Sequence, residues 1–278
     1  MHRFLFILLA TVFLPVLATA QTIDKIKSSG TIVIGFRTDA APLSYLADNS
    51  PQGYTPTICF ELAAYIGKSV GLTDLNVIFE SVDTENRFDL VESGEIDLLC
   101  GAATITLSRM EQVDFSDPVY VDGTTVALKK DAPEQFADLA GQKIGVRSGT
   151  TTLEALQTSL TAQNIEADVI QFDDHPSGMA ALEGDVIMAN FADQSILMNM
   201  VRSKGNASDF KVFDELLTIE KQGLAMRRGD TEFRLLVNAG LSSLYASGVM
   251  RQAFDTTIPG ATPGLAIEAM YLLAPTLP

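Results

Sequence analysis

The chain has 278 residues, 47% of them hydrophobic, and its 35 acidic against 19 basic side chains give a net charge of −16. This hydrophobic content is typical of a packed globular protein and excludes a largely disordered chain. The negative charge repels nucleic acid and anionic lipid, so neither is an expected partner. An anionic small molecule would need arginines gathered at its own site, which makes the position of each arginine informative.

The first 20 residues have the pattern of a secretory signal. Arg3 precedes an apolar run from Phe4 to Leu17, and the small residues Ala18 and Ala20 predict cleavage after Ala20. The alternative, a retained membrane anchor, is disfavoured because the run is short for a bilayer and contains Pro15. We therefore expect an exported, soluble mature chain.

Short apolar runs alternate with helical patterns along the rest of the chain. Runs typical of buried strands lie at 31–36, 75–80, 96–100, 143–146, 168–172 and 186–189. Helices are predicted after a cap at Thr55 and at 86–93, 151–160, 176–182, 193–203 and 231–246. The alternation predicts an α/β fold with mostly parallel, doubly wound sheets, and the pattern occurs twice.

Cys59 and Cys100 are the two cysteines of the chain. Export permits a disulfide, but the spacing does not give the distance between the sulfurs, so a bridge and two buried thiols both remain open. Beyond the signal segment the chain has a single histidine, His175, which leaves too few ligands for a zinc site. We expect neither a metal nor another cofactor.

The segment from Cys100 to Arg109, followed by 114–120, carries the strongest functional signal. It reads as the end of a strand, a tight turn of Gly, Ala and Thr residues, and a short helix that carries Arg109. Small side chains let the backbone approach a small molecule, and the arginine offers that molecule a bidentate cation. The segment resembles the ligand-cradling segment of family 3 periplasmic solute-binding proteins, the amino-acid receptors of ABC importers.

This resemblance implies a two-lobe periplasmic-binding-protein fold of type II. Each lobe would contain a mostly parallel sheet flanked by helices, with the ligand cleft between the lobes and two crossing segments acting as a hinge. Lobe one would comprise 22–118 and 229–278, and lobe two 119–228. The implied location is the periplasm, and the implied state is a monomer.

The resemblance also assigns residues to the α-carboxylate of an amino acid. Arg109 would clamp it, whereas a solvated surface arginine is the alternative. Thr104 would add a hydroxyl from the same lobe. Ser148 and Thr151 would close on it from the second lobe, where a helix N-terminus favours an anion, with ordinary helix capping as the other interpretation.

Two positions are implied for the α-amino group. The backbone around Ala102 would accept a hydrogen bond from it, although relatives often have serine at this position. Asp193 would pair with the ammonium charge, whereas the same residue could simply cap a helix.

A further set of residues matches the glutamate/aspartate-binding branch of the family, which surrounds a side-chain carboxylate with two arginines, a hydroxyl and a histidine. The matching residues are Arg37, Thr84, Arg87 and His175. In a general amino-acid receptor they would be unrelated surface residues, with His175 as a helix cap. Grouped cations would offset the cost of burying a second carboxylate. We also expect His175 to donate in its protonated form, so that affinity falls as the pH rises past neutrality.

These expectations together describe the substrate-binding component of an ABC importer that closes on glutamate or aspartate and presents its closed form to a membrane permease. No nucleophile, base and oxyanion arrangement can be assembled from the sequence, so we do not expect an enzyme. Two alternatives remain, a dehydratase-like enzyme on the same fold and a ligand sensor for a signalling receptor. The choice between glutamate and aspartate is also open.

Overall fold

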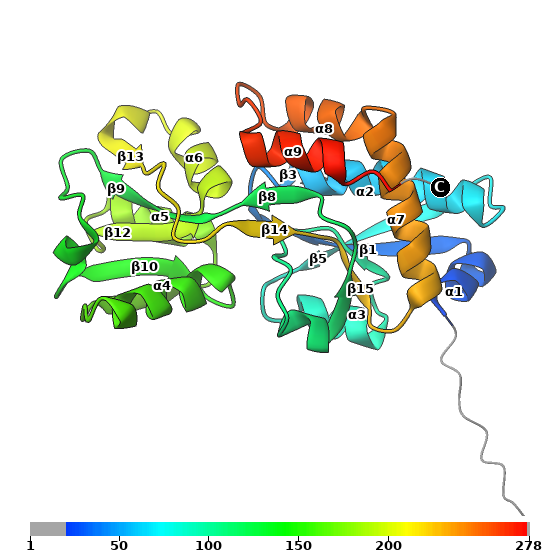
Figure 1. Cartoon of the computed structure of the whole chain (residues 1–278), viewed down its shortest axis with the longest axis horizontal. Helices are drawn as coiled ribbons and strands as arrows, with labels where there is room; N and C mark the ends of the chain where they lie inside the picture. The colour runs from blue at the N-terminus through cyan, green and yellow to red at the C-terminus, as the bar shows by residue number, and fades with distance from the viewer. Residues whose placement is uncertain (1–20, 277–278) are drawn as a thin grey trace, which may run out of the picture.

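The computed structural model describes residues 21–276 and has two five-stranded sheets at opposite ends of an elongated molecule (Figure 1). The predicted signal segment, 1–20, lies outside the described residues. The first sheet has the order β5-β1-β6-β15-β7. Its strands are β1 (Thr31–Arg37), β5 (Asn76–Val82), β6 (Leu98–Leu99), β7 (Val113–Phe115) and β15 (Ala225–Arg227). The second has the order β11-β10-β12-β9-β13. Its strands are β9 (Thr124–Lys129), β10 (Lys143–Arg147), β11 (Asp168–Phe172), β12 (Ala189–Asp193) and β13 (Phe210–Val212).

Both sheets are mixed rather than mostly parallel. β1 pairs in parallel with β5 and β6, and β10 pairs in parallel with β11 and β12. The antiparallel strands β15 and β9 come from the segments in which the chain passes between the two sheets. The α/β class is therefore confirmed, while the parallel pairing predicted from the strand–helix alternation holds only for three adjacent strands at one side of each sheet, β5-β1-β6 and β11-β10-β12.

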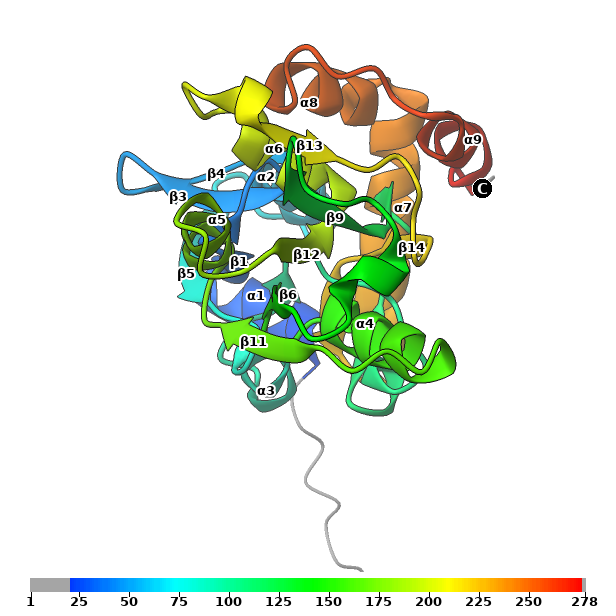
Figure 2. The same cartoon turned by 90° about the vertical axis from the view of Figure 1, so that its left-hand side faces the viewer.

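Helices cover both faces of each sheet. Those beside the first sheet are α1 (Thr22–Ser29), α2 (Tyr54–Ser69), α3 (Arg87–Ser93), α7 (Thr231–Ala246), α8 (Val249–Thr257) and α9 (Leu265–Leu273). Those beside the second are α4 (Thr151–Ala162), α5 (His175–Glu183) and α6 (Gln194–Arg202). Figure 2 shows α4 on one side of the second sheet and α5 and α6 on the other, and a separate apolar cluster fills each side.

Two short antiparallel strands, β8 (Tyr120–Asp122) and β14 (Glu220–Gln222), connect the two bodies. We call the body around the first sheet lobe one and that around the second sheet lobe two. The first crossing strand begins at Tyr120 and the second ends at Gln222, after which β15 pairs with β6 and β7 in lobe one.

Two element boundaries differ from those predicted. The strand predicted at 186–189 is β12 at 189–193, because Val186 lies in an exposed turn after α5 and Ala189 is the first residue paired with β10. Thr55 does not cap α2, which begins at Tyr54. Its hydroxyl lies within hydrogen-bond distance of the carbonyls of Leu43, at 2.9 Å, and Cys100, at 3.0 Å, and shares its one proton between them, which ties the helix to the 100–109 segment.

A disulfide joins Cys59 of α2 to Cys100, directly after β6. The two α-carbons are 6.4 Å apart, and both side chains are fully buried in the core of lobe one. The bridge fixes the start of the 100–109 turn to α2. Of the two alternatives that the sequence left open, the structure has the disulfide.

Replacing both cysteines with alanine is expected to lower the free energy of unfolding by about 2–4 kcal/mol, because the closed loop restricts the unfolded chain. The loop spans a sequence separation of 41 residues. Denaturant titration followed by circular dichroism measures the change. The control is the same titration of wild-type protein in dithiothreitol, because the reduced protein lacks the bridge but keeps both cysteine side chains in the core. An unchanged midpoint under reducing conditions would contradict the expectation.

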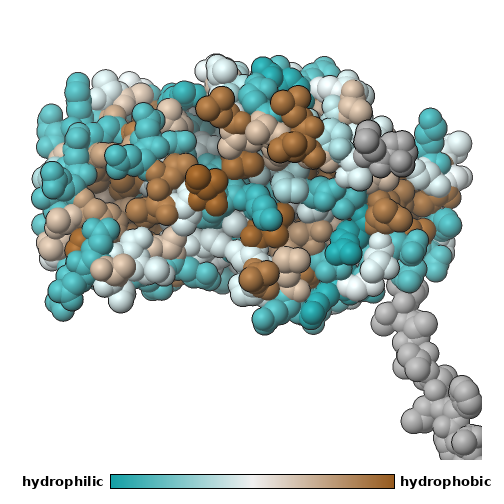
Figure 3. Space-filling model, viewed as in Figure 1, coloured by the Kyte–Doolittle hydropathy of each residue, from teal (hydrophilic) through white to brown (hydrophobic). Residues whose placement is uncertain are grey.

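In the view of Figure 3, apolar side chains gather over α8 and α9 and in several other patches among polar ones. Leu265, Leu272 and Leu273 of α9 are each more than 80% exposed. No helix among residues 21–276 combines the length and the apolar character needed to cross a bilayer.

Candidate functional site

Side chains from both lobes meet between the sheets, where the parallel strands end. Eight of the ten predicted ligand residues line one cavity there: Arg37, Arg87, Ala102, Thr104, Arg109, Thr151, His175 and Asp193. Thr150, Thr152 and Ile196 complete its wall. The cavity measures about 20 Å³, which is enough for about one water molecule. An amino acid can therefore enter only when the lobes are farther apart.

The other two predicted residues, Thr84 and Ser148, lie beside the cavity and contact each other across the cleft. The Thr84 hydroxyl donates to the Ser148 carbonyl at 3.1 Å, and Arg87 Nη2 donates to the Gly149 carbonyl at 3.2 Å. Gly149 has a φ of +64°, and a β-carbon there would come within 2.9 Å of the Thr84 hydroxyl. Glycine is thus required both by the backbone conformation and by the close approach of the lobes.

Arg87 and Arg109 are the two cavity arginines that have no carboxylate within 4.0 Å among the described residues. Arg87 is 2% exposed, and its Nε has no hydrogen-bond partner within residues 21–276. Arg109 donates to the Thr104 carbonyl at 2.9 Å. Both guanidinium groups lie over the ring of Phe88, at 4.8 and 5.4 Å from its centroid. Burial lowers the pKa of both arginines, and for Arg87 the charges of Arg37 and Arg109 add to the effect.

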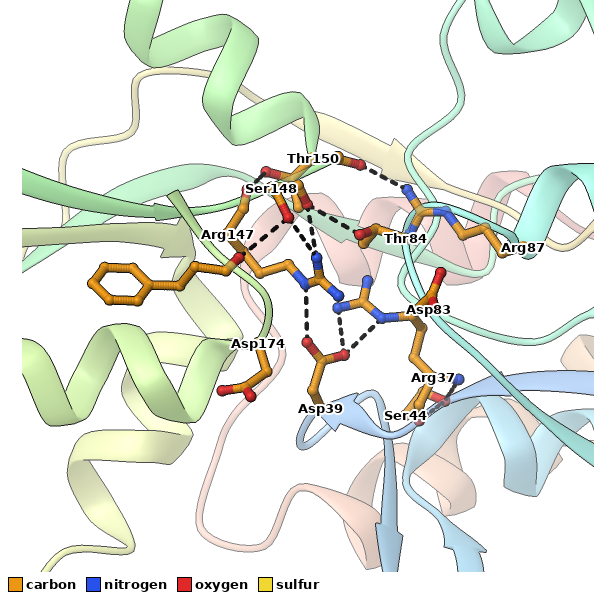
Figure 4. Close-up of polar contacts among 12 residues, drawn as sticks. Arg37, Asp39, Ser44, Asp83, Thr84, Arg87, Arg147, Ser148, Thr150 and Asp174 are labelled. Carbon is orange, nitrogen blue, oxygen red and sulfur yellow. Dashed lines mark hydrogen bonds and ion pairs between the residues drawn. The ribbon is translucent and has the colours of Figure 1, made fainter. Parts of the chain in front are cut away.

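Arg37 lies in a chain of three charges that the sequence analysis did not find. Its Nε donates to Asp39 at 2.7 Å, and Arg147 of lobe two donates to the other oxygen of Asp39 at 3.1 Å (Figure 4). Burial opposes ionisation of Asp39, but the charge of Arg37 and the hydrogen bonds from Arg37 and Arg147 outweigh it and lower its pKa to about 2. The position of Arg147 at the end of a strand beside Ser148 is the one sequence signal that could have indicated it.

Asp193 is the buried acid of the cavity. It stands at the N-cap position of α6 but makes no capping hydrogen bond, so the alternative interpretation as a helix cap is wrong. Instead, it accepts from Gln222 Nε2 at 2.8 Å, and Thr152 lies 3.5 Å away. Burial raises the pKa of Asp193 well above its ordinary value, and the neighbouring carboxylates of Asp122 and Glu220 raise it further. A cation in the cavity would offset these effects.

Glu220, on the crossing strand β14, is a second residue that the sequence analysis missed. Its Oε2 accepts hydrogen bonds from the hydroxyls of Thr104 at 2.5 Å and Thr151 at 2.7 Å, one from each lobe. Burial disfavours its charge, but the hydrogen bonds from Thr104 and other hydroxyls outweigh this and lower its pKa. A hydroxyl has one proton, so while these two donate to Glu220 they can offer a ligand only their lone pairs. This arrangement differs from the predicted donation by Thr104 to a carboxylate.

His175 begins α5, which is capped by the side chain of Asp174 rather than by His175. Burial lowers the pKa of His175 to about 3, and the charges of Arg37 and Arg147 act in the same direction while Asp39 opposes them. The imidazole is therefore neutral at pH 7 in this conformation, in contrast to the predicted imidazolium. A neutral ring still donates one N–H, so the expected loss of affinity above neutrality does not follow from this geometry.

The sequence model of one protein family, the bacterial extracellular solute-binding proteins, family 3, matches residues 32–258 of this chain. The L-glutamate/L-aspartate-binding protein of Pseudomonas aeruginosa is 30% identical over 84% of this chain and 78% of its own. A glutamate/aspartate import solute-binding protein of Salmonella typhimurium is 29% identical over 86% of this chain and 80% of its own. The solved solute receptor for L-cysteine of Neisseria gonorrhoeae superposes with a TM-score of 0.77 at 26% identity, covering 88% of this chain and 98% of that one.

Proposed function

Because the chain belongs to family 3 of the bacterial extracellular solute-binding proteins, we propose that it binds an acidic L-amino acid, glutamate or aspartate, in the cleft between its lobes. The relatives from Pseudomonas and Salmonella carry glutamate and aspartate in their names, which supports this ligand class. The proposal depends first on the charges that line the cavity and their lack of partners.

The observation that carries the proposal is a pair of unpaired guanidinium groups beside one unpaired buried carboxylate. Arg87 and Arg109 have no acidic partner, and Asp193 has no basic partner, among residues 21–276. Buried charges normally have counter-ions, because each unpaired one costs several kcal/mol. An acidic amino acid supplies two carboxylates and one ammonium. These groups would give each arginine a carboxylate partner and Asp193 a cationic one.

The subsites follow from the positions of these groups. Arg109 and the N-terminus of α4, whose first residues line the cavity, would bind the α-carboxylate. Asp193 would pair with the α-ammonium, and Thr104 would accept from it because its proton is directed at Glu220. Arg87 and Arg37, with the neutral His175, would hold the side-chain carboxylate. Thr84 and Ser148 would hold the lobes together beside it.

Closure would occur by rotation about the two crossing strands, because they are the segments that carry the chain between the sheets. Ligand groups held from both lobes shift the population toward the closed form. We further propose that the closed form is delivered to the membrane permease of an ABC importer and that the protein acts in the periplasm as a monomer. The Salmonella relative is named as an import protein, which supports the transport role.

Titration calorimetry against glutamate, aspartate, glutamine, asparagine and glutarate tests the ligand class. We expect the two acidic amino acids to bind most tightly. Glutamine and asparagine lack the second charge, and glutarate lacks the ammonium, so each should bind at least about 10-fold more weakly, since one lost charge-assisted contact costs about 1.5–3 kcal/mol. Tighter binding of an amide or a basic amino acid than of glutamate would contradict the proposal.

A further inference from the structure

The ion pair between Asp39 and Arg147 joins the two lobes at one end of the cavity. Asp39 is in β2 (Asp39–Ala40) of lobe one, directly after β1, and Arg147 is the last residue of β10 in lobe two. Their side chains are 10% and 4% exposed, respectively. The pair is therefore largely shielded from water, and opening the lobes would break it.

Arg147 is held in a fixed orientation and lies outside the cavity wall. Its Nη1 donates to the carbonyl of Ser148 at 3.1 Å and to the hydroxyl of the same residue at 2.9 Å, while Nε donates to Asp39 (Figure 4). It is absent from the residues that line the cavity, whereas Arg37 is among them. Arg147 therefore makes no direct contact with a molecule in the cavity, and its hydrogen-bonded link to the cavity wall at this end runs through Asp39 and Arg37.

Asp39 is the carboxylate that both arginines share. With the lobes apart, Asp39 and Arg37 would form a neutral pair, because both belong to lobe one. When Arg147 arrives from lobe two, the three groups together carry one positive charge. Arg37 Nη2 is within ion-pair distance of Asp39, at 2.5 Å, yet it is one of the buried atoms with no hydrogen-bond partner among the described residues. Arg37 is itself a lining residue, so the positive charge of the group lies at the cavity wall.

We propose that Arg147 determines specificity for an acidic side chain by acting through Asp39. It shares the Asp39 carboxylate and leaves Arg37 with a positive charge for the side-chain carboxylate of the ligand. Because Arg147 is on the opposite lobe, this charge becomes available only on closure. The inference rests on the proposed function and deepens it: the closing motion completes the subsite that distinguishes glutamate from glutamine.

The test compares glutamate and glutamine affinities of Arg147→Gln by calorimetry. We expect glutamate affinity to fall about 10-fold or more, as when one partner of a buried charge pair is lost, and glutamine affinity to fall less than about 3-fold. Arg202→Gln is the matched control, since it removes one arginine from an exposed position of lobe two and should change neither value. Equal losses for both ligands would mean that Arg147 only holds the lobes together, and would overturn the proposal.

The second variant, Asp39→Asn combined with Arg147→Gln, separates charge sharing from general damage. Without the carboxylate there is nothing for Arg147 to neutralise, so the double variant should regain most of the ratio between glutamate and glutamine affinities. A ratio as low as that of Arg147→Gln alone would overturn the proposal. A damaged fold would not be repaired by a second substitution in the other lobe.

A third measurement is made without a ligand and again at saturating glutamate. Thermal unfolding of the wild type, both single variants and the double variant forms a double-mutant cycle for the cross-lobe pair. We expect Arg147→Gln to lower the melting temperature in the wild-type background and not in the Asp39→Asn background. Additive effects without ligand would show that the pair is not formed in the free protein, and additive effects that persist at saturating glutamate would overturn the inference. A wild type that binds no acidic amino acid would overturn the proposed function, and the cycle would still report separately on the coupling of the pair.

Discussion

Arg87→Met is expected to lower glutamate affinity by about 100-fold or more, because truncating one partner of a buried, hydrogen-bonded charge pair costs about 2–5 kcal/mol. Binding of glutamine should weaken much less, since its side chain carries no charge to be compensated. Arg87 has a single hydrogen bond, to the Gly149 carbonyl, and no carboxylate partner among residues 21–276. In the proposed complex the ligand would therefore be its main counter-ion. Calorimetry with both amino acids measures the difference.

The same substitution should raise the melting temperature of the protein without ligand. The guanidinium of Arg87 is buried beside two other arginines, and burial together with their charges lowers its pKa well below the ordinary value. Removing an uncompensated buried charge while keeping a similar apolar volume is stabilising or neutral. Arg228→Met, at an exposed position of lobe one, serves as the control for loss of one positive charge. A lower melting temperature together with equal losses for both ligands would contradict the assigned role.

Arg109→Met is expected to reduce the affinity for every amino acid by about 100-fold or more, because the α-carboxylate is common to all of them and loses its charged donor. The profile should differ from that of Arg87→Met, in which the loss is confined to acidic ligands. Calorimetry with glutamate, aspartate and glutamine distinguishes the two patterns.

The fold of the Arg109 variant needs a separate check, because Nη1 of this residue also donates to the Thr104 carbonyl at 2.9 Å. Arg109→Lys keeps the positive charge but not the bidentate geometry, so it should bind more weakly than the wild type and more tightly than Arg109→Met. Circular dichroism and the melting temperature show whether either variant is misfolded. Retention of glutamine binding in Arg109→Met would exclude this residue from the α-carboxylate subsite.

Comparing the affinity losses of Arg87→Met and Arg109→Met also tests whether the cavity has separate subsites for the two carboxylates of the ligand. If Arg87 and Arg109 bound the same carboxylate, both variants would lose all amino acids to a similar extent. Separate subsites predict that only Arg109→Met affects glutamine strongly. Phe88, whose ring lies beside both guanidinium groups, keeps them in place without neutralising either.

The sequence by itself determined the local elements and the family. Apolar runs and capping residues predicted the strands β1, β5 and β10 and the helices α4 and α7 to within about two residues. The 100–109 turn and the residues that follow strands indicated a cleft site, and eight of the ten predicted residues lie on one cavity. These features could be predicted because backbone propensity and the periodicity of apolar residues are properties of neighbouring positions in the chain.

The tertiary structure alone decided how the charges are paired. Asp39 and Arg147 are separated by 108 residues and Thr104 and Glu220 by 116, so no local pattern relates them. The disulfide, the return of the chain through β15 and the neutral state of His175 are decided in the same way. Each depends on distance or on exclusion of water, and both arise only when segments far apart in the sequence pack together in the folded chain.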